Sequence, residues 1–188
     1  MSKVFPKIIF TAIAISAAGA ATIYLSLIRG ENQTISKQNE IAKQTNTAVS
    51  VWDKATEASY SGTKEMTVYR SPSCGCCGVW IEHAEKHGFK VEDIKTEEMA
   101  ALKQKYNIPP QLAACHTTII DGYVIEGHIP ADDIKRFLTE KPELVGLAVP
   151  GMPLGTPGME AGDLKQPFQV FAFNEKGEVK VFKEYQSY

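Results

Sequence analysis

The sequence predicts a mixed α/β domain over residues 66–188, and three observations support this fold class. Segments with alternating apolar and polar residues, typical of strands, are interleaved with segments whose apolar residues recur at helical spacing. Asp121-Gly122 joins two strand-like segments and is a strong signal for a β-hairpin. The chain has 188 residues, 44% of them hydrophobic and 22% charged, a composition that excludes wholesale disorder and collagen-like repeats.

The predicted elements follow one another in a definite order. They are a strand over 66–69, a helix over 77–87, a strand over 89–92, a helix after residue 96, strands over 116–120 and 123–127, and a helix over 131–139. Pro72 breaks the first strand, and Gly88 ends the first helix. Thr96 is suited to cap the second helix, which ends at Pro109-Pro110.

This order of strands and helices is that of a thioredoxin-like α/β sandwich. A loop rich in Gly, Pro and Met over 149–159 follows the last helix. After it, strands over 168–173 and 178–182 flank a turn at 174–177. We therefore expect a thioredoxin-like domain over 66–188 with an added C-terminal β-hairpin.

An uncharged run over 8–28 follows Lys3 and Lys7 near the N-terminus and ends at Arg29. At about 1.5 Å per helical residue it is long enough to cross a hydrocarbon layer of about 30 Å. Residues 1–30 are thus either an N-terminal membrane helix that anchors the protein or a signal peptide cleaved at Ala18-Gly19-Ala20. We favour the anchor, because cleavage would leave an apolar new N-terminus.

Charge and composition set expectations for location and for the segment after the anchor. Lys3 and Lys7 should stay in the cytoplasm, so the folded part is expected in the periplasm, anchored to the inner membrane by residues 8–28. Residues 31–65 are rich in polar residues and are predicted to be a tether, although the spacing of Ile35, Ala42 and Val49 also suits a short helical stalk.

The folded part is mildly acidic, which argues against nucleic acid as a partner.

The four cysteines are the strongest functional signal. Cys74-Gly75-Cys76-Cys77 lies between the first predicted strand and the first helix, where a thioredoxin-like fold places redox or ligand residues. Cys115 lies at the entry to the third predicted strand, at the edge that faces the N-terminus of that helix, so we expect all four sulfurs to converge. A helix N-terminus favours thiolates through its partial positive charge and free N–H groups.

Three interpretations of these cysteines are open from the residues alone. A soft metal is the first: one zinc ion would leave the four thiolates with excess negative charge, whereas four Cu(I) ions would neutralise them. Cys74 and Cys77 also have the CxxC spacing of a thiol–disulfide oxidoreductase, although Cys76 would invite wrong pairings. Structural disulfides are the third interpretation, but nearly contiguous cysteines close almost no loop.

Four motifs stand out in combination. They are SPSCGCCGVW over 71–80, CHTT over 115–118, GYVIEGHIP over 122–130 and GLAVPGMP over 146–153. With these motifs the chain resembles the CopG-like copper proteins, bacterial envelope proteins of copper-resistance loci, over nearly the whole folded part. The resemblance implies a thioredoxin-like fold in which Cys74, Cys76, Cys77 and Cys115 hold a multinuclear copper cluster. It also implies a role in copper resistance, with interconversion of Cu(I) and Cu(II) as one way to provide it.

We therefore expect an envelope copper-binding protein that holds several Cu(I) ions, with zinc as the less favoured metal. A copper exporter or a periplasmic copper chaperone is the expected protein partner. The alternative function is a thioredoxin-like thiol–disulfide oxidoreductase that uses Cys74 and Cys77. Whether the protein is an enzyme that turns copper over, or only holds it, is left open by the sequence.

Three further side chains are weaker candidates for the metal site. His116 directly follows a predicted ligand and is suited either to bind copper or to hydrogen-bond a ligand. Met152 and Met159 carry thioethers that suit Cu(I) and lie in the Gly/Pro-rich loop. The ordinary alternative for the two methionines is that they pack over the domain.

The remaining histidines are expected to lie outside the site. His128 precedes a predicted helix start, where capping or solvent contact is the usual role. His83 and His87 have the i, i+4 spacing of a metal-binding pair, but without a third ligand they are expected to form a solvated helix face.

Overall fold

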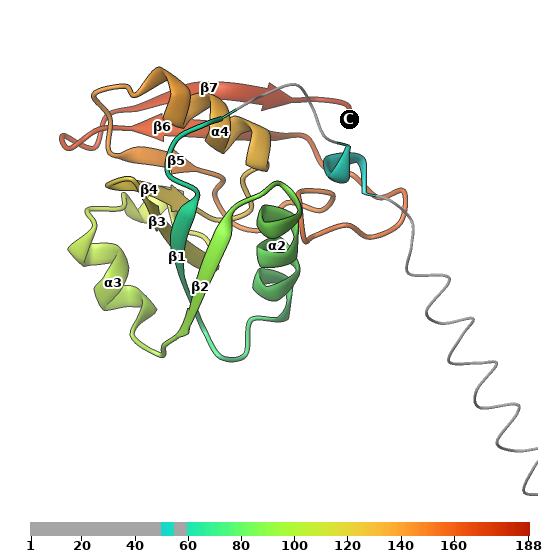
Figure 1. The fold of residues 1–188 in the computed structure, drawn as a ribbon, viewed down its shortest axis with the longest axis horizontal. Coiled ribbons are helices and arrows are strands. Elements are labelled where there is room, and N and C mark those ends of the chain that lie inside the picture. The colour runs from blue at the N-terminus through green and yellow to red at the C-terminus, as the bar shows by residue number, and fades with distance from the viewer. Residues whose placement is uncertain (1–49, 55–59) are drawn as a thin grey trace, which may run out of the picture. The chain divides into compact units, whose positions relative to one another are not determined.

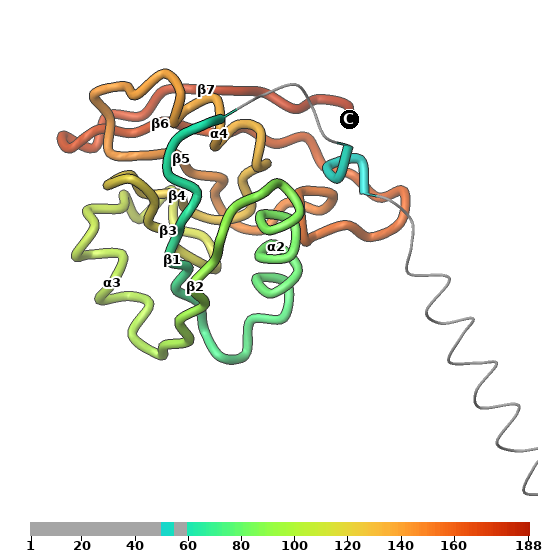
Figure 2. The backbone as a smooth tube through the Cα atoms, viewed as in Figure 1, coloured from blue at the N-terminus to red at the C-terminus, as the bar shows by residue number. Residues whose placement is uncertain are grey.

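The computed structural model describes residues 50–54 and 60–188, which all fall within one compact unit (Figures 1 and 2). The predicted membrane run over 8–28, the alternative cleavage site and most of the predicted tether over 31–65 lie outside these residues. Within the described ranges, no helix combines the length and the apolar character that a membrane crossing requires.

Seven strands form one sheet in the order β2-β1-β3-β4-β5-β6-β7. The strands are β1 (Glu65–Arg70), β2 (Lys90–Lys95), β3 (His116–Ile120), β4 (Tyr123–Glu126), β5 (Gly146–Ala148), β6 (Phe168–Phe173) and β7 (Val179–Tyr185). The pairs β1–β2 and β4–β5 are parallel, and the other neighbours are antiparallel. The predicted α/β class and the predicted C-terminal hairpin, β6–β7, are confirmed.

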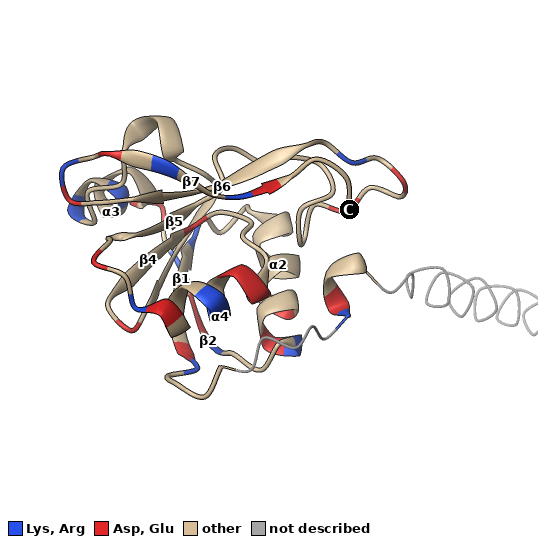
Figure 3. Ribbon diagram, turned by 90° about the horizontal axis from the view of Figure 1, so that it is seen from above, with Lys and Arg blue, Asp and Glu red and all other residues tan. Residues whose placement is uncertain are grey.

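The sheet carries a hydrophobic core on each face. Helices α2 (Gly75–Lys86) and α4 (Ala131–Glu140) supply side chains to the first core, and the chain that follows α3 (Met99–Lys105), including the 3-10 turn η2 (Pro110–Leu112), supplies the second. Successive strand residues serve opposite cores, because side chains alternate across a sheet: Val124 belongs to the second core and Ile125 to the first. Charged residues of both signs lie along α4 and around the β6–β7 turn (Figure 3).

Two elements differ from the sequence prediction in ways that matter for the site. Helix α2 begins at Gly75, two residues before the predicted start, so Cys76 and Cys77 are in its first turn. Strand β5 is not predicted at all, because three residues give no periodic pattern. It forms because β4 and β6 hold it on both sides by backbone pairing.

Residues 51–53 form a 3-10 turn, η1, that belongs to the folded unit. The Trp52 ring lies 5.3 Å from the Tyr185 ring and 5.0 Å from the Tyr188 ring, measured between centroids. This turn lies inside the range predicted as a polar tether. Burial of a large aromatic ring offsets the entropy lost when the chain is ordered, so the folded part extends upstream of residue 66.

His83 and His87 do not form the solvated face expected for them. The His83 side chain is buried, and its Nε2 accepts a hydrogen bond of 3.0 Å from the Ala131 N–H. The His87 side chain is also buried, with its Nε2 2.6 Å from the Trp52 carbonyl oxygen. Burial, and then the charge of neighbouring His87, lowers the pKa of His83 to about 3.

The low pKa of His83 makes a testable contribution to acid sensitivity. The unfolded chain takes up a proton near pH 6.5 and the folded chain only near 3, so the free energy of unfolding falls as pH falls between these values, by about 1.4 kcal/mol per pH unit. His83→Gln keeps an acceptor for the Ala131 N–H. We expect it to reduce the slope of unfolding free energy against pH by the contribution of one proton. Denaturant titrations from pH 4 to 6.5 measure it. An unchanged slope contradicts the assignment.

Candidate metal centre

The cysteine loop joins the end of β1 to the start of α2. A turn closes it, in which the Cys74 N–H donates to the Ser71 carbonyl at 3.0 Å. Cys74 is the N-cap residue of α2, and Cys76 and Cys77 lie in the first helical turn. The unpaired N–H groups and the dipole of this helix end stabilise negative charge on the sulfurs.

Cys115 reaches the same place from the other direction along the chain. Strand β3 pairs antiparallel with β1, with Arg70 opposite His116, so the residue before β3 lies beside the residues after β1. As a result the sulfurs of Cys74, Cys76, Cys77 and Cys115 all lie within 4.8 Å of one another. The structure therefore brings together all four cysteines that the sequence singles out.

The four cysteines are not in equivalent states. A disulfide joins Cys74 to Cys77, whereas Cys76 and Cys115 are free thiols. The Cys74 and Cys76 sulfurs are 3.6 Å apart. The centre can therefore present four thiolates when it is reduced, or a disulfide and two thiols when it is oxidised.

Two buried histidines flank Cys115. The Cys115 Sγ lies 3.4 Å from the His116 Nδ1 and 3.0 Å from the His128 Nε2. The His128 Nδ1 is 2.7 Å from the Pro157 carbonyl oxygen, which can only accept, so Nδ1 carries the proton and Nε2 is free to accept or to bind metal. His116 thus lies where a weaker ligand was predicted. The expectation of capping or solvent contact for His128 is wrong, because the loop before α4 folds inward over the site.

Burial sets the protonation states of these donors. Removal from water, and then the neighbouring Cys76, raises the pKa of the Cys115 thiol to about 12. Burial also lowers the pKa of His116 well below its usual value and lowers that of His128. Both imidazoles are thus neutral at pH 7, the form that binds metals, and a metal ion must displace the proton of Cys115.

The two predicted methionines occupy different positions. The Met152 sulfur lies 4.0 Å from the Cys76 sulfur, at the exposed side of the centre. Met159 contributes backbone hydrogen bonds to the Gly/Pro-rich loop: its N–H donates to the Thr156 carbonyl, and its carbonyl accepts from the Gly155 N–H. Met152 is therefore placed as a possible thioether donor, and Met159 shapes the loop.

The cations beside the centre already have acidic partners. Arg70 donates to the Cys74 carbonyl at 3.0 Å and forms an ion pair of 2.7 Å with Asp93. Its hydrogen bonds lower the pKa of the Asp93 carboxyl. The donor groups at the centre are thiols, imidazoles and a thioether, a set that fits Cu(I) or zinc and does not fit magnesium or calcium.

A buried carboxylate fixes the chain just before Cys115. Glu126 accepts hydrogen bonds from the Ala114 N–H at 2.7 Å and from the Thr117 hydroxyl at 2.6 Å, and it forms an ion pair with Lys103. Burial raises the pKa of this carboxyl against the opposing effect of Lys103. The sequence analysis missed Glu126, although a lone acidic residue in an apolar strand is a recognisable signal.

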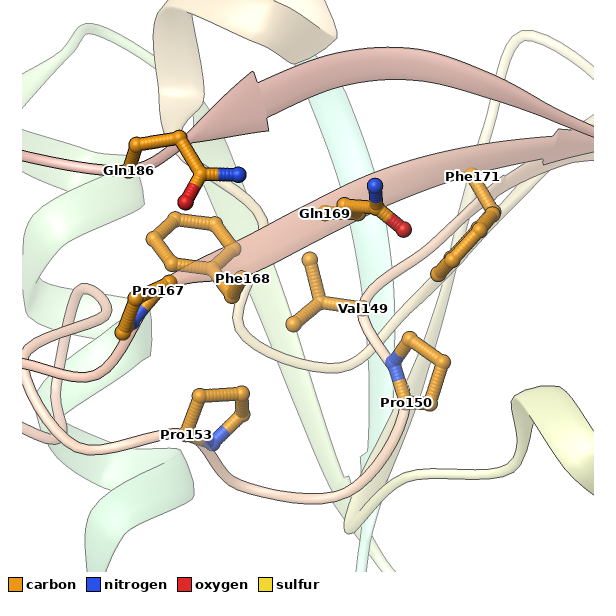
Figure 4. Close-up of a pocket in the computed structure, with 8 residues that line it drawn as sticks. All are labelled: Val149, Pro150, Pro153, Pro167, Phe168, Gln169, Phe171 and Gln186. Carbon is orange, nitrogen blue, oxygen red and sulfur yellow. The ribbon is translucent and has the colours of Figure 1, made fainter.

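A cavity of about 350 Å³ lies between the loop that carries Pro150 and Pro153 and strand β6 (Figure 4). It is lined by Val149, Pro150, Pro153, Pro167, Phe168, Gln169, Phe171 and Gln186. These side chains are apolar or carry amides, and none is a thiol, an imidazole or a carboxylate. We therefore place the chemistry at the cysteines and not in this cavity.

Fold and site together define an α/β protein with a thiol and imidazole centre suited to a soft transition metal. A family model described as "Protein of unknown function, DUF411" matches residues 112–159. Two solved structures named copper resistance protein CopG are similar: form 1 has 44% identity, covers 67% of this chain and 100% of its own, and has a TM-score of 0.64. Form 2 has 45% identity, covers 66% and 99%, and has a TM-score of 0.63.

The chain belongs to the CopG-like copper-resistance family. A comparison with curated proteins finds no match.

Replacement of Glu126 tests how the chain before Cys115 is held. Glu126→Ala leaves the Lys103 ammonium and the Ala114 N–H without their partner, so we expect unfolding free energy to fall by about 3 kcal/mol. We also expect faster labelling of Cys115 by a thiol reagent. Glu126→Gln is the matched control. It retains an acceptor for the Ala114 N–H, so its free energy of unfolding should fall by less. Wild-type stability in Glu126→Ala would show that the network does not hold this segment.

Proposed function

We propose that this protein is an envelope copper-binding protein that holds several Cu(I) ions through Cys74, Cys76, Cys77 and Cys115 and so contributes to copper resistance. The convergence of the four sulfurs within 4.8 Å carries the proposal. Both similar solved structures are named copper resistance proteins, which supports copper as the metal. His116, His128 and Met152 lie beside the sulfurs and complete a donor set that suits copper.

Charge favours several Cu(I) ions over one zinc ion. Four thiolates in a partly buried site carry four negative charges, and uncompensated charge in such surroundings is costly. Arg70 supplies little relief because it is already paired with Asp93. Four Cu(I) ions bridged by the thiolates neutralise the site, whereas one zinc ion leaves it negative.

The same residues support the reduction of Cu(II) to Cu(I), one direction of the interconversion expected from the sequence. In the reduced protein, the thiolates of Cys74 and Cys77 each give one electron to a Cu(II) ion, two Cu(I) ions form, and the two sulfurs join in a disulfide. A dithiol reductant restores the thiols by exchange. Cys76 and Cys115 stay free in this cycle and retain copper beside His116 and His128.

The Cys74–Cys77 disulfide at the start of α2 favours one alternative, a thiol–disulfide oxidoreductase that acts on other proteins. Both functions accord with a thioredoxin-like fold, which we propose from the order β1, α2, β2, α3, β3–β4 hairpin and α4. We further propose that residues 8–28 anchor the protein to the inner membrane, that residues 31–49 tether the domain in the periplasm, and that a copper exporter or periplasmic chaperone receives the metal.

Metal stoichiometry tests the proposed function. The reduced, metal-free protein titrated with Cu(I) without oxygen should bind about four ions per chain, because the thiolates bridge between ions. Cys76→Ser should lose most of this capacity. Gly75→Ala is the matched control in the same helical turn, since an added methyl there meets open space. Preferential binding of a single zinc ion would rule out the cluster, and insulin reduction without metal would favour the oxidoreductase.

Reduction of Cu(II) tests the redox step separately. The reduced protein mixed with Cu(II) under argon should yield about two Cu(I) ions for each Cys74–Cys77 disulfide, because one disulfide releases two electrons. A Cu(I) chelator and peptide mass spectrometry measure the two products. Cys77→Ser should not form this disulfide. If the wild type retains all its thiols after Cu(II) is added, the protein holds copper without converting it.

A further inference from the structure

The loop over residues 150–160, called here the covering loop, contacts the metal centre at several points. Its Gly151 N–H donates to the Ala113 carbonyl at 3.2 Å, two residues before Cys115. Its Met152 sulfur lies 4.0 Å from the Cys76 sulfur, and its Pro157 carbonyl accepts from His128. Gly158 packs so closely on the first turn of α2 that an added Cβ would lie 3.0 Å from the Cys76 carbonyl. The position of this loop therefore decides how well the sulfurs are covered.

The covering loop has little regular structure of its own to hold it in place. Its internal hydrogen bonds are short-range: the Gly155 N–H donates to the Met159 carbonyl at 2.9 Å and the Met159 N–H to the Thr156 carbonyl at 2.8 Å. The Thr156 N–H and hydroxyl both donate to the Pro153 carbonyl, at 3.3 and 2.8 Å. Gly155 and Gly158 have φ values of 90° and 80°, which glycine adopts readily and which leave the unfolded loop much freedom. Contacts from outside the loop therefore add to these internal bonds in fixing its conformation.

Gln166 supplies two such contacts, since its N–H donates to the Leu154 carbonyl at 2.9 Å and its Oε1 accepts from the Leu154 N–H at 2.9 Å. Others come from the segment upstream of the sheet. The Trp52 Nε1–H donates to the Gly155 carbonyl at 2.7 Å, and the Ser50 hydroxyl donates to the Glu160 carboxylate at 2.7 Å. The Trp52 indole packs edge-on against Phe168 and Tyr185 beside the loop. Figure 1 shows the turn η1 beside the stretch of chain that precedes β6.

The same segment is attached to the helix that carries the cysteines. Asp53 forms an ion pair of 2.8 Å with Lys86, and the Trp52 carbonyl lies 2.6 Å from the His87 Nε2, both near the end of α2. Residues 50–54 thus bridge α2 and the covering loop. Because Cys76 is at the start of α2 and Gly158 packs on that same turn, the bridge limits how far the loop can move from the sulfurs.

We infer that Trp52, with Ser50, is a positioning residue of the metal centre: it holds the covering loop over Cys76 and Cys115 and so controls access to the sulfurs and the release of copper. The copper part of this inference rests on the proposed function. The control of access does not, because it concerns the metal-free protein as well. Residues 50–54 therefore take part in the site through the covering loop.

The test compares three variants of the full-length, metal-free, reduced chain. Trp52→Ala removes both the ring and the donor to Gly155. We expect a thiol reagent to label Cys76 and Cys115 about tenfold faster, the change typical of losing one hydrogen bond together with its packing contacts. Trp52→Phe keeps much of the packing but loses the donor to Gly155, so its rate of thiol labelling should rise about threefold. Phe182→Ala is the matched control, since Phe182 packs on Arg136 and Phe137 of α4 and should destabilise the domain without freeing the loop.

Amide hydrogen exchange separates a local from a global effect. In Trp52→Ala, exchange at Gly155 and Met159 should increase while Val124 and Val145, whose amides are bonded within the sheet, remain as in wild type. If Trp52→Ala and Phe182→Ala speed labelling and exchange equally at equal stability, Trp52 contributes only to folding and the inference is overturned.

Copper release is measured in a separate experiment. Transfer of Cu(I) from the loaded protein to a chelator should be faster in Trp52→Ala, with the number of bound ions unchanged. A wild-type protein that binds no copper would refute the proposed function, and the labelling and exchange results would still decide the role of Trp52. Wild-type transfer rates in a Trp52→Ala protein that does bind copper would overturn the inferred control of release.

Discussion

The antiparallel pairing of β1 with β3 is the constraint on which the metal centre depends. It sets the last residue of β1, Arg70, opposite the first residue of β3, His116. The chain that leaves β1 and the chain that enters β3 therefore lie at the same edge of the sheet, the first with three cysteines and the second with Cys115. A slip of one residue would exchange the faces of His116 and Thr117 and carry Cys115 away from the cysteine loop.

Burial gives the centre its electrostatic character. Its imidazoles are neutral and the Cys115 thiol holds its proton, since charge is disfavoured away from water. The charged side chains beside it are matched within the protein, Arg70 by Asp93 and Lys103 by Glu126. Negative charge that develops on the sulfurs must then be balanced by what binds them, which favours metal cations and links their binding to proton release.

The sequence correctly predicted features that depend on residues close together in the chain. Asp121-Gly122 forms the predicted hairpin turn, with φ values of 49° and 82°, because these two residue types tolerate the left-handed backbone that such turns require. Strand β5 and the inward position of His128 were missed for the opposite reason. Gly146 lets β5 approach β4 so closely that an added Cβ would clash with the Val124 backbone, and a pattern of three residues cannot reveal this.

The sequence by itself determined the α/β class, the C-terminal hairpin and the set of four cysteines, since periodicity, turn residues and thiol chemistry can be read over short stretches of chain. Only the tertiary structure decided that these sulfurs meet, that His116 and His128 flank Cys115, that Cys74 and Cys77 are joined, and that Trp52 packs on the domain. The approach of Cys115 to the cysteine loop, the inward position of His128 and the packing of Trp52 are long-range contacts set by strand register and burial. Register and burial depend on the whole chain folding around one sheet, whereas the CxxC spacing of Cys74 and Cys77 and the place of His116 next to Cys115 can be read from the sequence.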